Sequence, residues 1–178
     1  RATPLPPVPA HGFLLGASTE SALLAASLDW HFVFAAHLNG DPELLREVVT
    51  AWRQHSVREV IVAVQAIVAP TQAEADALAQ KVEVWGVELA NGQRVTVASE
   101  EQAYAFARQA GSKPVRIARR AQSLLAGTAA SVLEQLNALH QQWGIEEFII
   151  DTPVADGATR VQSLRLLAEA RLNREVTV

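Results

Sequence analysis

The hydrophobic positions of this chain fall into short continuous runs separated by longer segments of helical periodicity. Four runs predict buried strands: 13–15 (FLL), 32–36 (FVFAA), 60–68 (VIVAVQAIV) and 147–151 (EFIID). They lack the strict apolar–polar alternation of a strand with one wet face. The pattern therefore predicts strands covered on both faces, as in a parallel sheet.

The segments between these runs carry helix signals. Asp41 and Pro42 begin one helix, and two capping boxes, Thr71 with Glu74 and Ser99 with Gln102, begin two more. The predicted helices cover 18–28, 41 to about 52, 72 to about 89, 99–110, 115–125, 129–143 and 161–172, with a short strand at 95–97. Strands alternating with helices predict an α/β fold with right-handed crossovers, built as a single domain over residues 1–178.

Composition excludes several function classes. The chain has 178 residues, 49% of them hydrophobic, and a formal net charge of -4, which is ordinary for one globular domain that does not bind nucleic acid. No apolar run approaches the roughly 20 residues that span a membrane. Cysteine is absent, which excludes disulfides and thiolate sites and fits a cytoplasmic protein. Methionine is also absent, even at position 1, which suggests a fragment or a processed product.

The stretch 12–26 (GFLLGASTESALLAA) is the best candidate for a binding site. It predicts a strand, a turn of small residues and a helix. Gly16 and Ala17 would let a ligand approach the backbone, and a helix N-terminus with the hydroxyls of Ser18 and Ser21 would suit a phosphate. The alternative is that Ser18 only caps its helix, with Ser21 closing the first turn.

Other candidates are weaker. His37 ends a predicted strand, and histidine is a common general acid or base, so it is a candidate catalytic residue or a packed or capping histidine. Arg160 would either pair with an anion or with Asp156 at a helix start. The densest basic cluster, Arg116, Arg119 and Arg120, is interpreted as a solvated helix face or a dimer contact. The sequence carries no metal motif, no Gly-rich dinucleotide fingerprint and no G-x-S-x-G.

The order of several segments resembles the luciferase-like flavin-dependent monooxygenases. The matching segments are LLGASTESALLAA, FVFAAH, VIVAVQAIVAPTQAEADALA, GTAASVLEQLNAL, WGIEEFIIDTP and ATRVQSLRLLAEA, which run from about Pro4 to about Leu172. The resemblance implies a parallel-stranded (β/α)8 TIM barrel of the bacterial luciferase type. Because a complete barrel needs about 250 residues, only its second half, about four βα units, would be present.

The resemblance also implies a chemistry. Reduced FMN would be held through its phosphate by Gly16, Ala17, Ser18 and Ser21, and His37 would act at the mouth of the barrel. The protein would oxidise a small organic substrate with O2, with NAD(P)H as the indirect electron source through a separate flavin reductase, and it would be a homodimer. Two alternatives stay open: a non-catalytic flavin-binding or structural half-barrel, and a deazaflavin-dependent reductase of the same fold.

Overall fold

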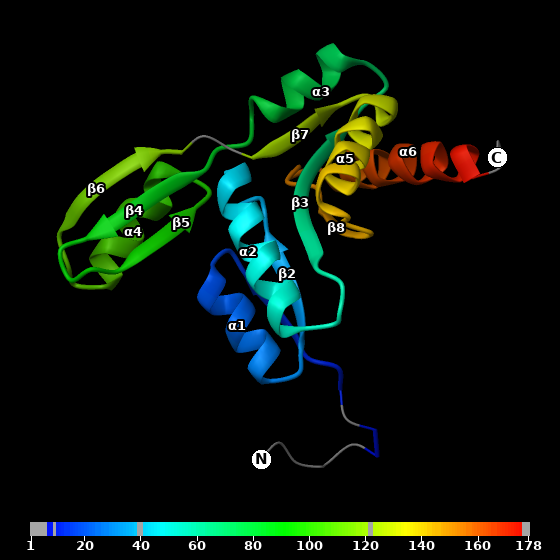
Figure 1. Ribbon diagram of the computed structural model, residues 1–178. Helices are drawn as coiled ribbons and strands as arrows, with labels where there is room; N and C mark the ends of the chain where they lie inside the picture. Colours follow the sequence, from blue (N-terminus) through cyan, green and yellow to red (C-terminus); the bar gives the residue numbers. More distant parts are fainter. Residues whose placement is uncertain (1–6, 9, 39–40, 121–122, 176–178) are drawn as a thin grey trace. The chain divides into compact units, whose positions relative to one another are not determined.

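The computed structural model describes residues 7–8, 10–38, 41–120 and 123–175, and the chain divides into two compact units. The first unit comprises 1–65 and 135–151, and the second comprises 66–134 and 152–178 (Figure 1). Both boundaries at 65 and 134 fall inside secondary-structure elements. The single domain predicted from the sequence stays a prediction.

The first unit is built on a parallel sheet. Its elements are β1 (Phe13–Gly16), α1 (Thr19–Ser27), β2 (His31–Ala35), α2 (Pro42–His55), the first five residues of β3 (Ile61–Val68), most of α5 (Ala129–Trp143) and β8 (Glu147–Asp151). The strands are paired in the order β1-β2-β3-β8, and every pair is parallel. The four predicted strands and their parallel arrangement are therefore confirmed.

Helices α1 and α2 cover one face of this sheet (Figure 1). Trp52 of α2 is fully buried, and its ring centroid lies 5.5 Å from that of Phe32. Its indole Nε1 donates a 2.7 Å hydrogen bond to the carbonyl of Arg58, so the buried polar atom is satisfied. Ala22 and Ala25 are also fully buried, and their small side chains let α1 pack closely.

The opposite face of the sheet is apolar but covered only at its centre. Val33, Ile61 and Ala63 form a small buried cluster there. On the flanking strands, Phe13 of β1 and Ile149 of β8 are 54% and 46% exposed. The expectation that every strand is covered on both faces is thus confirmed for β2 and β3 and wrong for β1 and β8, which lie at the two sides of this sheet.

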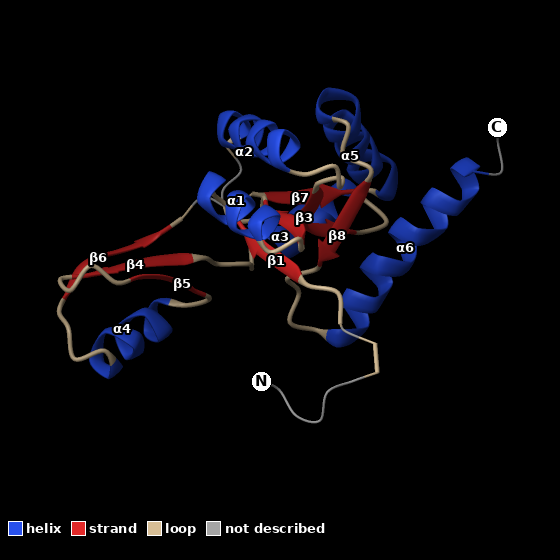
Figure 2. Ribbon diagram, turned by 60° about the horizontal axis from the view of Figure 1, so that its bottom comes forward, coloured by secondary structure: helices blue, strands red, loops and turns tan. Residues whose placement is uncertain are grey.

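The second unit holds an antiparallel sheet that the sequence analysis did not predict. Its elements are the end of β3, α3 (Gln72–Ala79), β4 (Trp85–Leu89), β5 (Arg94–Val97), α4 (Glu100–Gln109), β6 (Pro114–Arg119), β7 (Leu124–Gly127) and α6 (Gly157–Glu175). Strands β5, β4 and β6 pair in that order, and α4 packs on one face (Figure 2). Strand β7 instead joins the end of β3 in the parallel sheet.

One predicted helix is too long, and another is wrong. The helix that begins at Thr71 ends at Ala79, and the segment predicted as its second half is strand β4. The segment predicted as a helix over 115–125 contains strands β6 and β7. In both cases pairing with a distant strand outweighs a local helical preference, because β4 forms ladders with β5 and β6 at once.

Candidate functional site

The turn between β1 and α1 presents two hydroxyls at a helix N-terminus. Ser18 is the N-cap of α1, and its Oγ accepts a 3.2 Å hydrogen bond from the backbone N–H of Ser21. The Oγ atoms of Ser18 and Ser21 also lie 3.2 Å apart. The predicted cap is therefore confirmed. It does not exclude the phosphate site, because both hydroxyls lie at the same helix end and are half-buried.

Gly16 is required by the close approach of β1 and α1. A Cβ atom on Gly16 would lie 2.4 Å from Cβ and 2.6 Å from Oγ of Ser21. Both are far below ordinary contact distance, and Ser21 Cβ is fixed to the first turn of the helix. The glycine therefore allows the short distance between the end of the strand and the two serines. From the sequence, Gly16 was expected to give a ligand access to the backbone.

Glu20 places a carboxylate at this same helix end. Its own backbone N–H and then the Ser18 hydroxyl hydrogen-bond the carboxylate and hold the pKa of Glu20 below its usual value. This turn thus already stabilises a negative charge, as the partial positive charge of a helix N-terminus predicts. A phosphate that bound here would have to displace the exposed Glu20 side chain. Sequence reasoning missed this competition, although Glu20 lies between the two serines.

His37 lies in the turn after β2, two residues beyond Ala35, whereas the sequence predicted that it ends the strand. Its ring Nδ1 is 3.4 Å from the carbonyl oxygen of Ala63 on the neighbouring strand, and the side chain is half-buried. When Nδ1 carries the proton and donates to this carbonyl, Nε2 is the free proton acceptor of the ring. The catalytic role of His37 stays a prediction.

A polar pair lies at the same edge of the sheet. Gln65 of β3 is the register partner of Asp151 at the end of β8, and its Nε2 donates a 2.9 Å hydrogen bond to Asp151 Oδ2. Gln65 was not among the candidates predicted from the sequence. The signal was there, because Gln65 is the single polar residue in the apolar run 60–68.

The register brings Gln65 and Asp151 to one level of the sheet. They are partners, and each follows by two positions a residue of the pair Ala63 and Ile149. Because side chains alternate along a strand, residues two apart share a face. His37 lies in the turn after β2, where its ring reaches the Ala63 carbonyl. The turn after β2, the middle of β3 and the end of β8 thus offer an imidazole, an amide and a carboxylate that could contact one small molecule.

Arg160 and Ser163 of α6 each hydrogen-bond a backbone group. The guanidinium of Arg160 donates to the Val154 carbonyl at 2.6 and 3.0 Å, while the Asp156 carboxylate accepts from Thr159. The predicted pairing of Arg160 with Asp156 side chains is therefore wrong. Ser163 is buried, and its Oγ accepts a 2.8 Å hydrogen bond from the N–H of Val68 at the end of β3.

The described residues contain no group of three or more His, Asp or Glu side chains placed to hold a metal ion. Among the same residues, no helix is long and apolar enough to cross a membrane. Thr152, which follows β8, is 4% exposed, and its Oγ1 has no hydrogen-bond partner among the described residues.

No model of a protein family matches the chain. Over 164 residues it is 37% identical to the N-acetyl-S-alkylcysteine monooxygenase of Bacillus subtilis (strain 168), which covers 90% of this chain and 49% of that enzyme. Among solved structures, apo-MsnO8 superposes with a TM-score of 0.65 and 22% identity, covering 94% of this chain and 53% of that one.

A third similar protein was solved with a flavin. It is the oxygenating constituent of 3,6-diketocamphane monooxygenase from Pseudomonas putida in complex with FMN, with a TM-score of 0.50, 18% identity and coverage of 87% of this chain and 45% of that one. The solved structures share the fold, which confirms the predicted α/β class and its extent of roughly half a barrel. The chain spans about half the length of each of these three proteins.

Proposed function

Because the chain is related to the luciferase-like flavin monooxygenases over about half of their length, we propose that it forms the half of such an enzyme that holds the FMN phosphate. The observation that carries the proposal is the β1–α1 turn, where Ser18, Ser21 and the first amides of α1 converge. One protein of the same fold is known in complex with FMN.

The donors in this turn fit a phosphate group. Two hydroxyls can donate hydrogen bonds, and the helix N-terminus adds a partial positive charge. The Glu20 carboxylate already accepts hydrogen bonds from its own N–H and from the Ser18 hydroxyl, which lowers the pKa of Glu20. Ala17 adds no side chain beyond a methyl group, so the backbone stays accessible beside Ser18.

The remaining polar residues supply the groups that would act on a substrate. Bound reduced flavin supplies the electrons with which O2 oxidises the substrate. In our proposal His37 accepts or returns a proton at Nε2, since its Nδ1 faces a backbone carbonyl. Gln65 orients the Asp151 carboxylate by its amide hydrogen bond, so that the second carboxylate oxygen can accept from the substrate.

The proposal extends to partners. Reducing equivalents would come from NAD(P)H through a separate flavin reductase, the protein would act in the cytoplasm, and it would form a homodimer. The first substrates to assay are small N-acylated thioether amino acids, since the Bacillus subtilis relative is named for that chemistry. The exposed Phe13 and Leu15 belong to the apolar sheet face that the other half of a barrel would cover.

The test is FMN binding by the purified protein, by a variant with both serines replaced and by a control variant. We expect a yellow protein whose FMN dissociation constant rises about tenfold in Ser18→Ala with Ser21→Ala, because hydrogen bonds to a charged group are lost. Ser27→Ala is the matched control, since that exposed serine lies at the other end of α1. FMN affinity unchanged in the double variant would return both serines to simple capping, and a colourless protein that takes up no FMN would favour the non-catalytic half-barrel.

A further inference from the structure

The antiparallel sheet of the second unit has one apolar face and one charged face. Val87 of β4 and its register partners Val95 and Ile117 pack against α4. The next position along β4 is Glu88, whose partners are Arg94 on β5 and Arg116 on β6. Because side chains alternate across a sheet, these three charged residues share the face that α4 does not cover.

Arg120 joins this face in a fixed position. It lies one residue beyond β6, and its backbone N–H continues the ladder with a 2.7 Å hydrogen bond to the carbonyl of Val84. Its side chain lies directly over the backbone of Gly86, since a Cβ on Gly86 would stand 2.4 Å from Arg120 Nε and 3.2 Å from Cζ. A side chain on Gly86 would therefore force the Arg120 side chain to shift away from this position.

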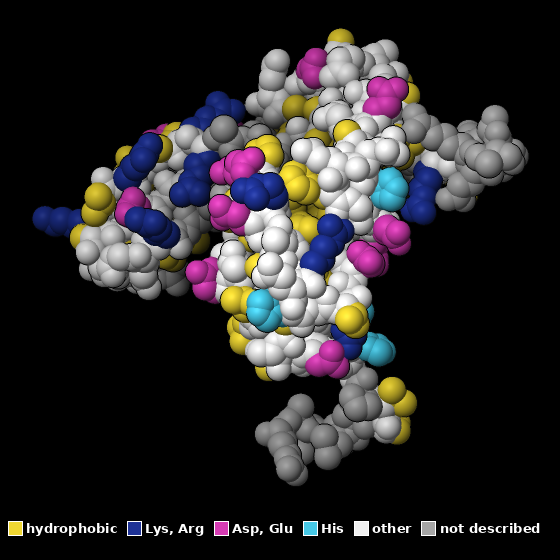
Figure 3. Space-filling view, in the orientation of Figure 1, with side chains coloured by type: hydrophobic (Ala, Val, Ile, Leu, Met, Phe, Trp, Pro, Cys, Tyr) yellow, Lys and Arg dark blue, Asp and Glu magenta, His cyan; other side chains and the backbone are white. Residues whose placement is uncertain are grey.

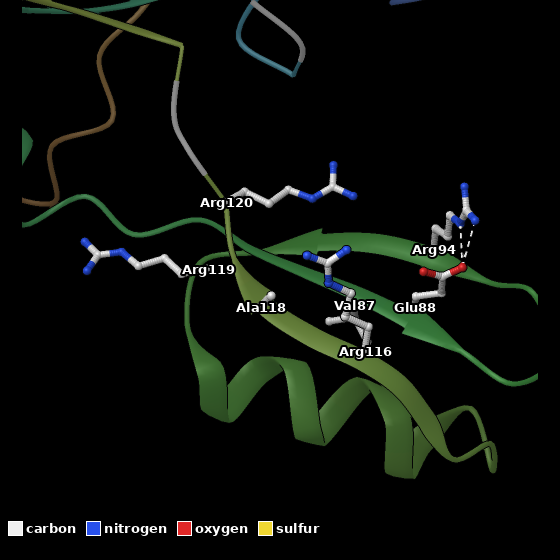
Figure 4. A pocket seen from close by; sticks show the side chains of 8 residues that line it. Val87, Glu88, Arg94, Arg116, Ala118, Arg119 and Arg120 are labelled. Atoms are coloured by element: carbon white, nitrogen blue, oxygen red, sulfur yellow. Dashed lines mark hydrogen bonds and ion pairs between the residues drawn. The ribbon is translucent and has the colours of Figure 1, made fainter.

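The charges on this face are unbalanced. Arg94 is paired with Glu88, to which its Nε and a terminal nitrogen donate at 3.2 and 2.7 Å. Arg119 points the other way in Figure 4 and lies 3.6 Å from Glu83. Among the described residues, Arg116 and Arg120 have no ion-pair partner. Three guanidinium groups therefore face a single carboxylate, and Figure 3 shows Lys and Arg side chains gathered over this sheet.

These residues and Arg119, whose side chain points away from them, line a hollow of about 450 Å³ (Figure 4). This is within the range of about 300–1,000 Å³ that is common for small-molecule sites. Its arginines come from β5, β6 and the residue after β6, and its floor includes Gly86 and Ala118. The sequence had suggested a solvated helix face or a dimer contact for Arg116, Arg119 and Arg120. In a strand, Arg116 and Arg120 fall on the same side, four residues apart, and Arg119 falls on the other.

We propose that this face binds the phosphate group of a small phosphorylated molecule, with Arg116 and Arg120 as its main ligands. The guanidinium fork matches phosphate oxygens with two hydrogen bonds from each arginine. After Arg94 and Glu88 neutralise each other, two positive charges remain, which match the charge of about −1.5 to −2 on a phosphate monoester at pH 7 better than that of a single carboxylate. This site belongs to the second unit and the serine turn to the first.

The test is calorimetric titration of the full chain with inorganic phosphate, AMP and acetate. The titrations use the Ser18→Ala, Ser21→Ala background, so that the turn before α1 does not contribute. We expect phosphate and AMP to bind, and their affinity to fall at least about tenfold in Arg116→Gln with Arg120→Gln and with rising ionic strength. Tighter binding of AMP than of phosphate assigns the site to nucleotides, and equal binding assigns it to the phosphate group alone.

Two further variants separate a site from a general charge effect. Arg108→Gln removes one arginine from the exposed surface of α4, on the opposite side of the sheet, and should leave binding unchanged. Gly86→Ala removes no charge but displaces Arg120, and should weaken binding while far-UV circular dichroism stays native. Binding that survives in the double arginine variant, acetate binding equal to that of phosphate, or equal losses in Arg108→Gln would overturn the proposal.

Discussion

Replacing Gly16 by alanine tests the geometry on which the flavin proposal depends. The new Cβ would lie 2.4 Å from Ser21 Cβ, at least 1.0 Å inside the 3.4 Å at which ordinary contacts begin. Ser21 Cβ cannot rotate away, because it is held by the first turn of α1. The strand end and the helix must therefore move apart, with Ser18 between them.

The cost follows from overpacking. Forcing an extra methyl group into a filled position typically destabilises a protein by about 1–3 kcal/mol. A loss of about 2 kcal/mol lowers the Tm by about 4–8 °C in a chain of this size. Displacement of the two hydroxyls should also weaken FMN binding by about tenfold, the equivalent of one hydrogen bond to a charged group.

The assay is thermal unfolding by circular dichroism together with FMN fluorescence titration. Gly157→Ala is the matched control, because a Cβ at that position at the start of α6 meets no atom within 4 Å. We expect this variant to keep the wild-type FMN affinity and to be unchanged or stabilised by up to about 1 kcal/mol. If Gly16→Ala has the same Tm and the same FMN affinity as the wild type, this description of the turn is wrong.

Three other predictions concern single hydrogen-bonded groups. Hydrogen bonds from the Thr159 hydroxyl and then from its N–H lower the pKa of Asp156 from 3.8. The stability that these hydrogen bonds contribute should therefore be complete above pH 3.8 and lost as the pH falls through the lower pKa of the folded state. In denaturant titrations at pH 6 and below, Asp156→Asn should lose less free energy of unfolding on acidification than the wild type. Ser163→Ala should cost about 1–3 kcal/mol in urea unfolding, because it leaves the buried amide at the end of β3 without an acceptor. Glu20→Gln should raise FMN affinity at low ionic strength by removing a carboxylate from the phosphate position, and a lower affinity would contradict that competition.

Local signals in the sequence determined the elements whose hydrogen bonds join residues close together in the chain. Asp41 caps α2 and Thr71 with Glu74 caps α3 as predicted, since the side-chain oxygen and the N–H that it accepts from are two or three residues apart. Helix α5 matches its predicted bounds, and the apolar runs became the four strands of the parallel sheet. The Ser18–Ser21 turn belongs to the same class of local structure.

Long-range pairing decided what the sequence could not. Gln65 and Asp151 are 86 positions apart, so their hydrogen bond exists only because β3 and β8 are paired. Segments 85–89 and 114–119 carry patterns that also suit a helix. They are strands because they pair with each other in the antiparallel sheet. That pairing placed Arg116 and Arg120 on one face, since the period of side-chain direction is about 3.6 residues in a helix and 2 in a strand.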